Sequence, residues 1–323
     1  MKKNEIYWLS CLQGFSMLTV VVGHVYDHSN WVYGIYEKYL QDFIYIFHMP
    51  LFMFISGYLF NLTKISNNTS YKTVIKEKVV RLLIPYFAFN LITFVLKLLF
   101  PRIMNRTVDF SFNQFVQAFI TLTNMPLYEM WFINVLFFFM VLYPLYCKIL
   151  QKNVLSIVFS IITLISLFFP INFAFIFDFN KICKYIVYFW FGILTYQYKD
   201  TIKKINNLHF SIVITLLFIA QYIIGLHYSH RLMQLIAPII SIIFFVQLFY
   251  KIGKKTPNLF SSFRNYTYQI FLVGIFIQVF VRVTIFQFFE RNIISTLMLY
   301  LFSISLLESG GNRHLESGRI NQF

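Results

Sequence analysis

The chain has 323 residues, of which 59% are hydrophobic and only 12% are charged. Soluble domains carry about 25% charged residues, so this chain has too few charges to cover a surface that faces water. The composition excludes a soluble globular protein and predicts that lipid is the solvent. We attribute the formal net charge of +15 to membrane topology and anionic lipid headgroups. Nucleic-acid binding is not expected, because no basic patch lies on a separate soluble unit.

The apolar segments predict a polytopic membrane protein. A bilayer core about 30 Å thick needs roughly 20 apolar residues per helix. About ten runs meet this need, over residues 6–26, 43–62, 82–100, 130–149, 153–170, 181–198, 209–227, 232–250, 266–288 and 293–307. We therefore predict an all-α helical bundle with one membrane domain over residues 1–307. The polar tail, residues 308–323, is expected to be disordered or non-native.

Basic residues orient this bundle. With the N-terminus inside, most of the 27 Lys and Arg residues fall at cytoplasmic ends and loops. The positive-inside rule then places both termini in the cytoplasm. We expect the protein to lie in the cell (plasma) membrane as a multi-pass protein. The first apolar run lacks a small-residue cleavage site, so we expect it to be retained as a helix.

The first predicted span ends in a group of titratable side chains. His24 lies near its outer end, and Asp27 and His28 follow at i+3 and i+4 on the same helical face. A carboxylate there can hold one imidazole nitrogen and leave the other as a base. Two alternatives stay open: the three side chains are simply solvated at the interface, or they bind a metal ion without an evident fourth ligand. We favour catalysis by His24 and Asp27 and expect no metal.

Two further polar residues lie within apolar runs. Gln13 precedes His24 by eleven residues, which is within about 20° of three full helical turns, so the two share one stripe. Such a stripe should face the bundle interior or a cavity. His48 lies two residues before Pro50, and it either satisfies a carbonyl freed by the proline or neighbours the active site.

A basic group precedes the third predicted span. Lys76, Lys78 and Arg81 lie on the predicted inner side, and Lys78 and Arg81 share a face by i,i+3 spacing. Lys and Arg side chains suit phosphate groups. These residues hold the phosphates of a cytoplasmic ligand or, in the alternative interpretation, touch only lipid phosphates.

Four stretches occur in a familiar order: "LQGFSMLTVVVGH" (12–24), "IYIFHMPLFMFISGYLF" (44–60), "KEKVVRLLIPYF" (76–87) and "MWFINVLF" (130–137). They resemble successive signatures of the acyltransferase-3 family. Its members are integral membrane proteins that O-acylate, usually O-acetylate, cell-surface polysaccharides with acetyl groups from cytoplasmic acetyl-CoA. The chain is most similar to short forms such as the fucose 4-O-acetylase-like proteins, which lack an appended hydrolase domain.

The resemblance carries over to individual residues. The family pattern of a basic residue, ten residues and a histidine matches His24, but Gln13 stands at the basic position. The pattern of two basic residues three apart matches Lys78 and Arg81. Many members have a histidine in a late helix, and in "TYQIFLVG" (267–274) that position is Gly274. The departures at Gln13 and Gly274 bear on the activity rather than on the fold.

The resemblance implies a membrane O-acetyltransferase. His24 would deprotonate the acceptor hydroxyl or form a transient acetyl-histidine, while acetyl-CoA serves as acyl donor. Its expected partners are the bilayer, a surface or lipid-linked glycan acceptor and glycan-assembly machinery. The residues with assigned roles are His24 and Asp27 (catalysis), Gln13 and His48 (channel), and Lys76, Lys78 and Arg81 (donor binding).

Two alternatives belong to other functional classes. The chain could transport or export a polysaccharide or lipid-linked sugar without acyl transfer, or it could be a structural partner in a glycan-assembly complex. A transporter site is often built on broken helices in two related halves. We see no matched halves in this sequence, which favours the enzyme.

Overall fold

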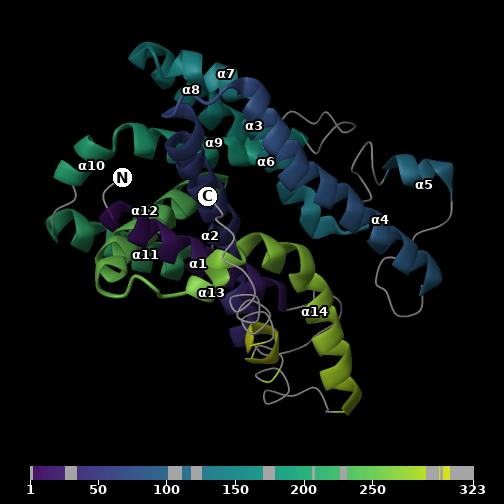
Figure 1. Cartoon of the computed structure of the whole chain (residues 1–323). Helices are drawn as coiled ribbons and strands as arrows, with labels where there is room; N and C mark the ends of the chain where they lie inside the picture. Colours follow the sequence, from purple (N-terminus) through teal and green to yellow (C-terminus); the bar gives the residue numbers. More distant parts are fainter. Residues whose placement is uncertain are drawn as a thin grey trace. The chain divides into compact units, whose positions relative to one another are not determined.

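The computed structural model (Figure 1) describes residues 3–25, 35–100, 111–117, 126–169, 179–205, 208–225, 231–288, 298 and 301–305. Within these ranges every regular element is a helix and there is no strand, which confirms the all-α prediction. The chain forms two compact units. Unit 1 comprises Met1–Phe52 and Thr201–Phe323, and unit 2 comprises Met53–Asp200. The boundary falls inside helix α2 (Ile35–Phe60).

Unit 1 is built around helix α1, which packs against α12, α13 and α14. Gly253 of α12 approaches the backbone of Trp8, whereas Phe245 contacts Phe15 further along α1, so these two helices run antiparallel. Besides part of α2, the helices of this unit are α1 (Lys3–Val25), α11 (Leu208–Gly225), α12 (Arg231–Lys255), α13 (Ser261–Asn265) and α14 (Thr267–Phe288). Helix α10 (Lys199–Ile205) crosses the unit boundary.

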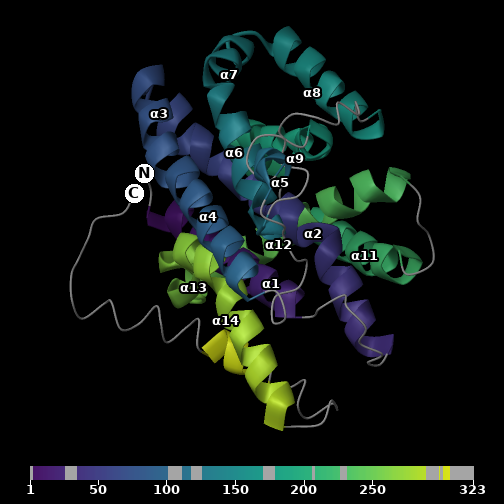
Figure 2. The same ribbon diagram turned by 90° about the vertical axis from the view of Figure 1, so that its right-hand side faces the viewer.

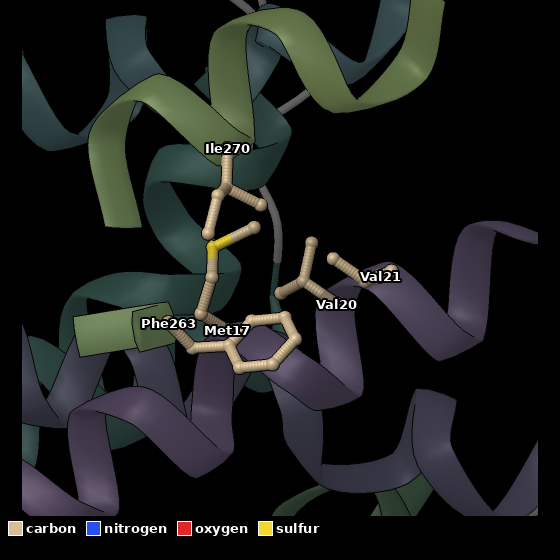
Figure 3. Close-up of a cluster of buried hydrophobic side chains, with 5 residues drawn as sticks. All are labelled: Met17, Val20, Val21, Phe263 and Ile270. Atoms are coloured by element: carbon tan, nitrogen blue, oxygen red, sulfur yellow. The ribbon is translucent and has the colours of Figure 1, made fainter. Parts of the chain in front are cut away.

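An apolar cluster joins α1 to α13 and α14. Met17 of α1 lies between Phe263 and Ile270, with Val20 and Val21 beside it (Figure 3). All five side chains are buried, and burying a side chain of this size stabilises the fold by about 1.5–3 kcal/mol. This cluster fixes the C-terminal part of α1, including the turn that leads to His24.

Unit 2 contains two π-helical turns, η1 (Asn61–Ile65) and η2 (Val79–Leu83). Figures 1 and 2 show α3 (Tyr71–Lys78) and α4 (Ile84–Leu99) as a nearly continuous rod, and η2 is the segment that joins them. The other helices are α5 (Phe112–Val116), η4 (Tyr128–Met130), α6 (Trp131–Val141), α7 (Tyr143–Ile149), α8 (Asn153–Phe168) and α9 (Phe179–Gln197). Helices α6 and α7 are bent by 50°, because Pro144 in the first turn of α7 cannot continue the hydrogen bonding of α6.

Two glycines set the contact between α2 and α9 in unit 2. A Cβ atom at Gly57 would lie 2.0 Å from the carbonyl oxygen of Phe189, and one at Gly192 would lie 2.0 Å from that of Phe54. Only glycine allows this close approach of two helix backbones, a packing device that is common in membranes. Asn61 adds a hydrogen bond of 2.9 Å from its side chain to the carbonyl of Ile193.

Several helices expose apolar faces. Helix α8 exposes valine, leucine and isoleucine along its length, as α4 and α11 also do. In water each such side chain would forgo about 1.5–3 kcal/mol of burial energy, whereas in hydrocarbon the exposure costs nothing. On α8 these residues are Val154, Leu155, Ile157, Val158, Ile161, Ile162 and Ile165. The faces therefore support a membrane protein.

Among the described residues, fewer helices than predicted are long and apolar enough to span a membrane. Each of the first nine predicted ranges contains helix in the described part of the chain. However, only three described helices are long and apolar enough to cross a membrane, over Tyr39–Ile65, Tyr71–Leu99 and Leu235–Lys255, or four if the bent α6 and α7 are counted as one span. The apolar helices Asn153–Phe168 and His209–Ile223 are too short by this measure. The tenth range falls mostly outside the described residues, so ten spans and the side of each terminus stay predictions.

Candidate active site

Three aromatic rings of unit 1 meet where the end of α1 packs against α2. The ring centroid of His24 lies 6.0 Å from that of His48 and 6.1 Å from that of Tyr45. The rings of Tyr45 and His48 are 4.7 Å apart. Gly23 makes this approach feasible, because a Cβ atom there would already lie 3.1 Å from Ile44. The structure thus brings together His24 and His48, which the sequence predicted separately. We call these three rings the histidine site.

Both imidazole rings are held by their own helices. Nδ1 of His24 lies 2.8 Å from the carbonyl oxygen of Val20, and Nδ1 of His48 lies 2.9 Å from that of Ile44. A carbonyl oxygen only accepts hydrogen bonds, so each Nδ1 carries the proton and donates it. In the neutral ring Nε2 then holds the lone pair. Each histidine therefore presents one basic nitrogen in a defined orientation.

The two histidines differ in burial. His48 is only 3% exposed, whereas His24 is partly accessible. The sequence left two alternatives for His48, namely to satisfy the carbonyl freed by Pro50 or to neighbour the active site. A proline frees the carbonyl four residues earlier, that of Ile46, and His48 bonds to Ile44 instead. His48 therefore packs beside His24 and does not satisfy the carbonyl that Pro50 frees.

Asp27 and His28 lie outside the described residues. The Val20 carbonyl already holds Nδ1 of His24, a task that we had assigned to the Asp27 carboxylate. The catalytic role of Asp27 therefore stays a prediction, as does the metal interpretation. Within the described segments no three His, Cys, Asp or Glu side chains gather as metal ligands.

Gln13 and Gly274 are the two positions that depart from the family pattern, and both are connected with α14. Gln13 contacts the start of that helix and Gly274 lies within it. Gln13 is partly exposed, and its Nε2 lies 3.5 Å from Oγ1 of Thr267 at the start of that helix. Gly274 is buried. One turn further on, buried Gln278 donates a hydrogen bond of 2.8 Å to the Val21 carbonyl. Sequence reasoning missed Gln278, although its i+4 spacing from Gly274 puts both on one face of α14.

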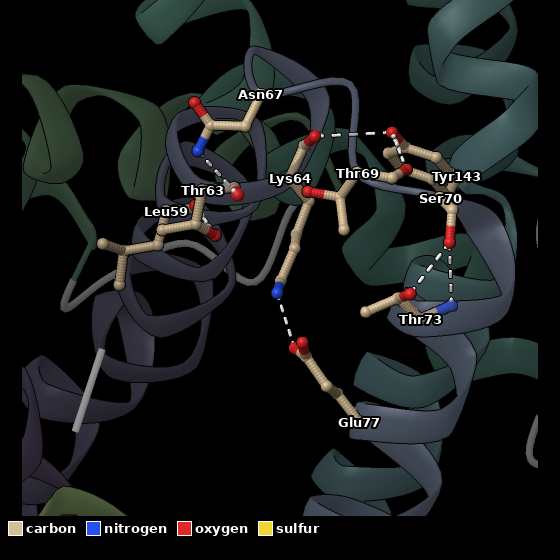
Figure 4. Close-up of polar contacts among 9 residues, drawn as sticks. All are labelled: Leu59, Thr63, Lys64, Asn67, Thr69, Ser70, Thr73, Glu77 and Tyr143. Atoms are coloured by element: carbon tan, nitrogen blue, oxygen red, sulfur yellow. Dashed lines mark hydrogen bonds and ion pairs between the residues drawn. The ribbon is translucent and has the colours of Figure 1, made fainter. Parts of the chain in front are cut away.

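A group of charged side chains occupies unit 2 where α3 meets η2 and η1. Lys64 forms an ion pair of 2.5 Å with Glu77 (Figure 4). Lys78 lies close enough to Lys64, Glu77 and Arg81 to interact with each of them electrostatically. We call Lys64, Glu77, Lys78 and Arg81 the basic cluster; it has three positive charges and one negative charge. The sequence analysis missed Lys64, which lies before a turn and reaches Glu77 only through the fold.

Local structure explains how Lys64 reaches this cluster. The chain turns between η1 and α3, and the Ser70 side chain caps α3 by accepting a hydrogen bond from the backbone N–H of Thr73. The Tyr143 hydroxyl of α7 donates a bond of 2.7 Å to the Thr69 carbonyl (Figure 4). These contacts fix the turn, so Lys64 faces Glu77 across it.

The three predicted donor-binding residues differ in exposure. Lys78 is partly buried, whereas Lys76 and Arg81 are exposed. Arg81 lies in the π-helical turn η2, and such turns occur frequently at functional sites. The wider π turn changes the α-helical spacing from which we inferred that Lys78 and Arg81 share a face. Their electrostatic interaction nevertheless keeps them in one cluster.

Comparison with known proteins gives one match. A family model described as an acyltransferase domain (Acyl_transf_3) matches residues 6–307, which is nearly the whole chain. Comparisons with curated proteins and with solved structures find no match.

Proposed function

The chain belongs to the acyltransferase-3 family, and from that premise we propose that it transfers an acetyl group from cytoplasmic acetyl-CoA to a hydroxyl of a cell-surface or exported polysaccharide. The family match confirms the resemblance seen in the four motifs and makes the protein a membrane acyltransferase. The acetyl donor, the glycan acceptor and a location in the plasma membrane are the parts that we propose.

The observation that carries the proposal is the orientation of His24. Its Nδ1 is bound to the Val20 carbonyl, so Nε2 is the nitrogen that can take a proton. Acyl transfer to a hydroxyl needs such a base, because a neutral hydroxyl is a weak nucleophile. The neighbouring ring of His48 also donates from Nδ1 to its own helix, so it does not occupy Nδ1 of His24.

The proposed step is balanced in atoms and charge. Nε2 of His24 removes the proton of the acceptor hydroxyl while its oxygen attacks the thioester carbonyl. The carbon–sulfur bond then breaks, and the CoA sulfur takes the proton back from His24. The products are an O-acetyl ester and free CoA, and no oxidant or metal is required.

The basic cluster supports an anionic donor. CoA carries several phosphate charges, and Lys78 and Arg81 can bind phosphate oxygens through charge-assisted hydrogen bonds. Arg81 is exposed and so accessible to a cytoplasmic ligand. Lys64 adds a third cation to the two that the motif predicts. Lys76 is exposed but has no electrostatic interaction with Lys78 among those described, so we expect it to contribute less.

The test is made in cells. O-acetyl groups on surface polysaccharide are quantified as acetate released by mild base from cells with the gene, without it, and with His24→Ala. His209→Ala is the matched control, because His209 is an exposed histidine at the start of α11 in the same unit. We expect acetate with the gene and with His209→Ala only, at equal protein levels in the membrane. Equal acetate in all four strains would reject the proposed function.

A further inference from the structure

A third polar side chain lies on the histidine face of α2. Gln41 precedes His48 by seven residues, which is within about 20° of two full helical turns. Tyr45 lies between them at i+4 from Gln41 and contacts His24. Gln41, Tyr45 and His48 therefore form one stripe on α2, and the two rings of that stripe contact the ring of His24.

The amide nitrogen of Gln41 is buried and has no hydrogen-bond partner among the described residues. Its side chain is 7% exposed, and within the described part of the chain its Nε2 has no hydrogen-bond partner. A buried amide without a partner is costly, and it is more so at membrane depth, where no water compensates. Such a group calls for an explanation, and a ligand that accepts its hydrogen bond is one.

Three comparable buried amides in the described segments have paired nitrogens, although the Oε1 atom of Gln221 has no partner there. Nδ2 of Asn61 donates to the Ile193 carbonyl, Nε2 of Gln278 to the Val21 carbonyl, and Nε2 of Gln221 to the Ser241 hydroxyl. Each of these bonds joins two helices and serves packing. Gln41 makes no such bond, so its donor is available on the histidine face.

The position of Gln41 fits the acceptor rather than the donor. It lies toward the N-terminal end of α2 from Tyr45, displaced by about 6 Å along the helix axis. The predicted topology puts that end at the outer side of the membrane, from which a glycan arrives. The displacement is comparable to the distance between hydroxyl groups on opposite sides of one sugar ring, and larger than the distance between adjacent ones. Gln41 can therefore contact one hydroxyl while a hydroxyl across the same sugar ring faces His24.

We propose that Gln41 is an acceptor-recognition residue: its Nε2–H donates a hydrogen bond to a hydroxyl oxygen of the sugar that is acetylated at His24. This assignment rests on the proposed function and extends it to the carbohydrate. A buried donor that binds a substrate hydroxyl rejects analogues lacking it, because the amide is then left unpaired. Gln41 would thus contribute to the choice of sugar and leave the acetyl donor unaffected.

The experiment uses the full chain in lipid nanodiscs with radiolabelled acetyl-CoA. The acceptor is the surface polysaccharide of cells that carry the gene, freed of O-acetyl groups by mild base. Gln41→Met keeps the length of the side chain and removes the donor. We expect the KM for polysaccharide to rise about tenfold, as for one lost hydrogen bond, with kcat and the KM for acetyl-CoA within twofold. Gln221→Met is the matched control, because Gln221 is also 7% exposed but pairs with Ser241.

Each outcome either supports or overturns the role of Gln41. An unchanged KM for polysaccharide in Gln41→Met would overturn the assignment. Equal increases in both KM values together with a lower melting temperature would also overturn it, in favour of a structural role. If Gln41→Met does not fold, Gln41→Glu is used instead, since it preserves the shape of the side chain and replaces the donor by an acceptor. The same rise in the KM for polysaccharide is expected. No transfer by the wild-type chain would reject the proposed function itself, whereas transfer with an unchanged KM in the variant rejects only the role of Gln41.

Discussion

The histidine site of unit 1 and the basic cluster of unit 2 hold their polar groups in different ways. Each imidazole is fixed by a backbone carbonyl four residues earlier in its own helix. In the basic cluster the side chains hold one another, with Lys64 paired to Glu77 and Lys78 close to both. The first arrangement is local and depends on two helices. The second depends on a turn, a π-helical segment and a tyrosine from α7.

This difference separates two chemical tasks. A neutral base needs a fixed tautomer, and the backbone carbonyls of Val20 and Ile44 provide this for His24 and His48. Anion binding needs an excess of positive charge that solvent and ligand can reach. Substitutions at the histidine site should therefore change the rate of acyl transfer. Substitutions at the basic cluster should change donor affinity and its dependence on salt.

The largest expected effect is at His24. His24→Phe retains an aromatic ring against Tyr45 and His48 but removes Nε2. We expect kcat to fall about 10²–10⁴-fold, the usual contribution of a general base, with the KM for acetyl-CoA unchanged. Transfer to de-O-acetylated polysaccharide in nanodiscs measures both values. The control His209→Phe should match wild type, and a His24→Phe enzyme with normal kcat would remove His24 from the mechanism.

The next largest effect should be on the fold of unit 2. Gly57→Ala places a Cβ atom 2.0 Å from the backbone oxygen of Phe189, so α2 and α9 must separate. We expect a loss of about 1–3 kcal/mol, typical of overpacking, seen as a lower melting temperature in detergent. Gly23→Ala is the comparison in unit 1, because its nearest neighbour is a side-chain atom of Ile44 at 3.1 Å. A larger loss in Gly23→Ala than in Gly57→Ala would contradict this interpretation.

Much of the fold follows from apolar run length, because in lipid a backbone must satisfy its hydrogen bonds within helices. Nine predicted ranges accordingly contain helices. The π-helical turns η1 and η2 were not predicted, since a single extra residue in a turn leaves no mark on hydropathy. The 50° bend between α6 and α7 was not predicted either, although Pro144 indicates a break in the helix at that point.

The candidate site was predictable only where its residues are close in sequence. His24 follows from its place at the end of an apolar run, and Lys78 and Arg81 follow from a motif. Lys64 and the contact between His24 and His48 depend on pairing between helices, which spacing along one helix does not report. Gln41 was missed for another reason: only the fold reveals that its amide nitrogen is buried without a partner.

A smaller effect is expected in the basic cluster. Arg81→Gln removes an exposed cation from η2 and should raise the KM for acetyl-CoA about tenfold, because a hydrogen bond to a charged group contributes roughly 1.5–3 kcal/mol. The difference from wild type should shrink as salt is raised, since salt screens exposed charges. Lys72→Gln, an exposed lysine on the adjoining helix α3, serves as control. A fall in kcat with unchanged KM would place Arg81 outside donor binding.

The smallest effect distinguishes two roles for Glu77. This carboxylate pairs with Lys64 and also interacts with Lys78 and Arg81, so it competes with an incoming phosphate for the same cations. Glu77→Gln should lower the KM for acetyl-CoA about two- to fivefold at low ionic strength, where the added net positive charge is least screened. Asp42→Asn, an exposed acid on α2 in unit 1, should have no effect. A higher KM in Glu77→Gln would instead mean that the ion pair holds Lys64 in its binding position, and the cluster would then depend on Glu77 for its geometry.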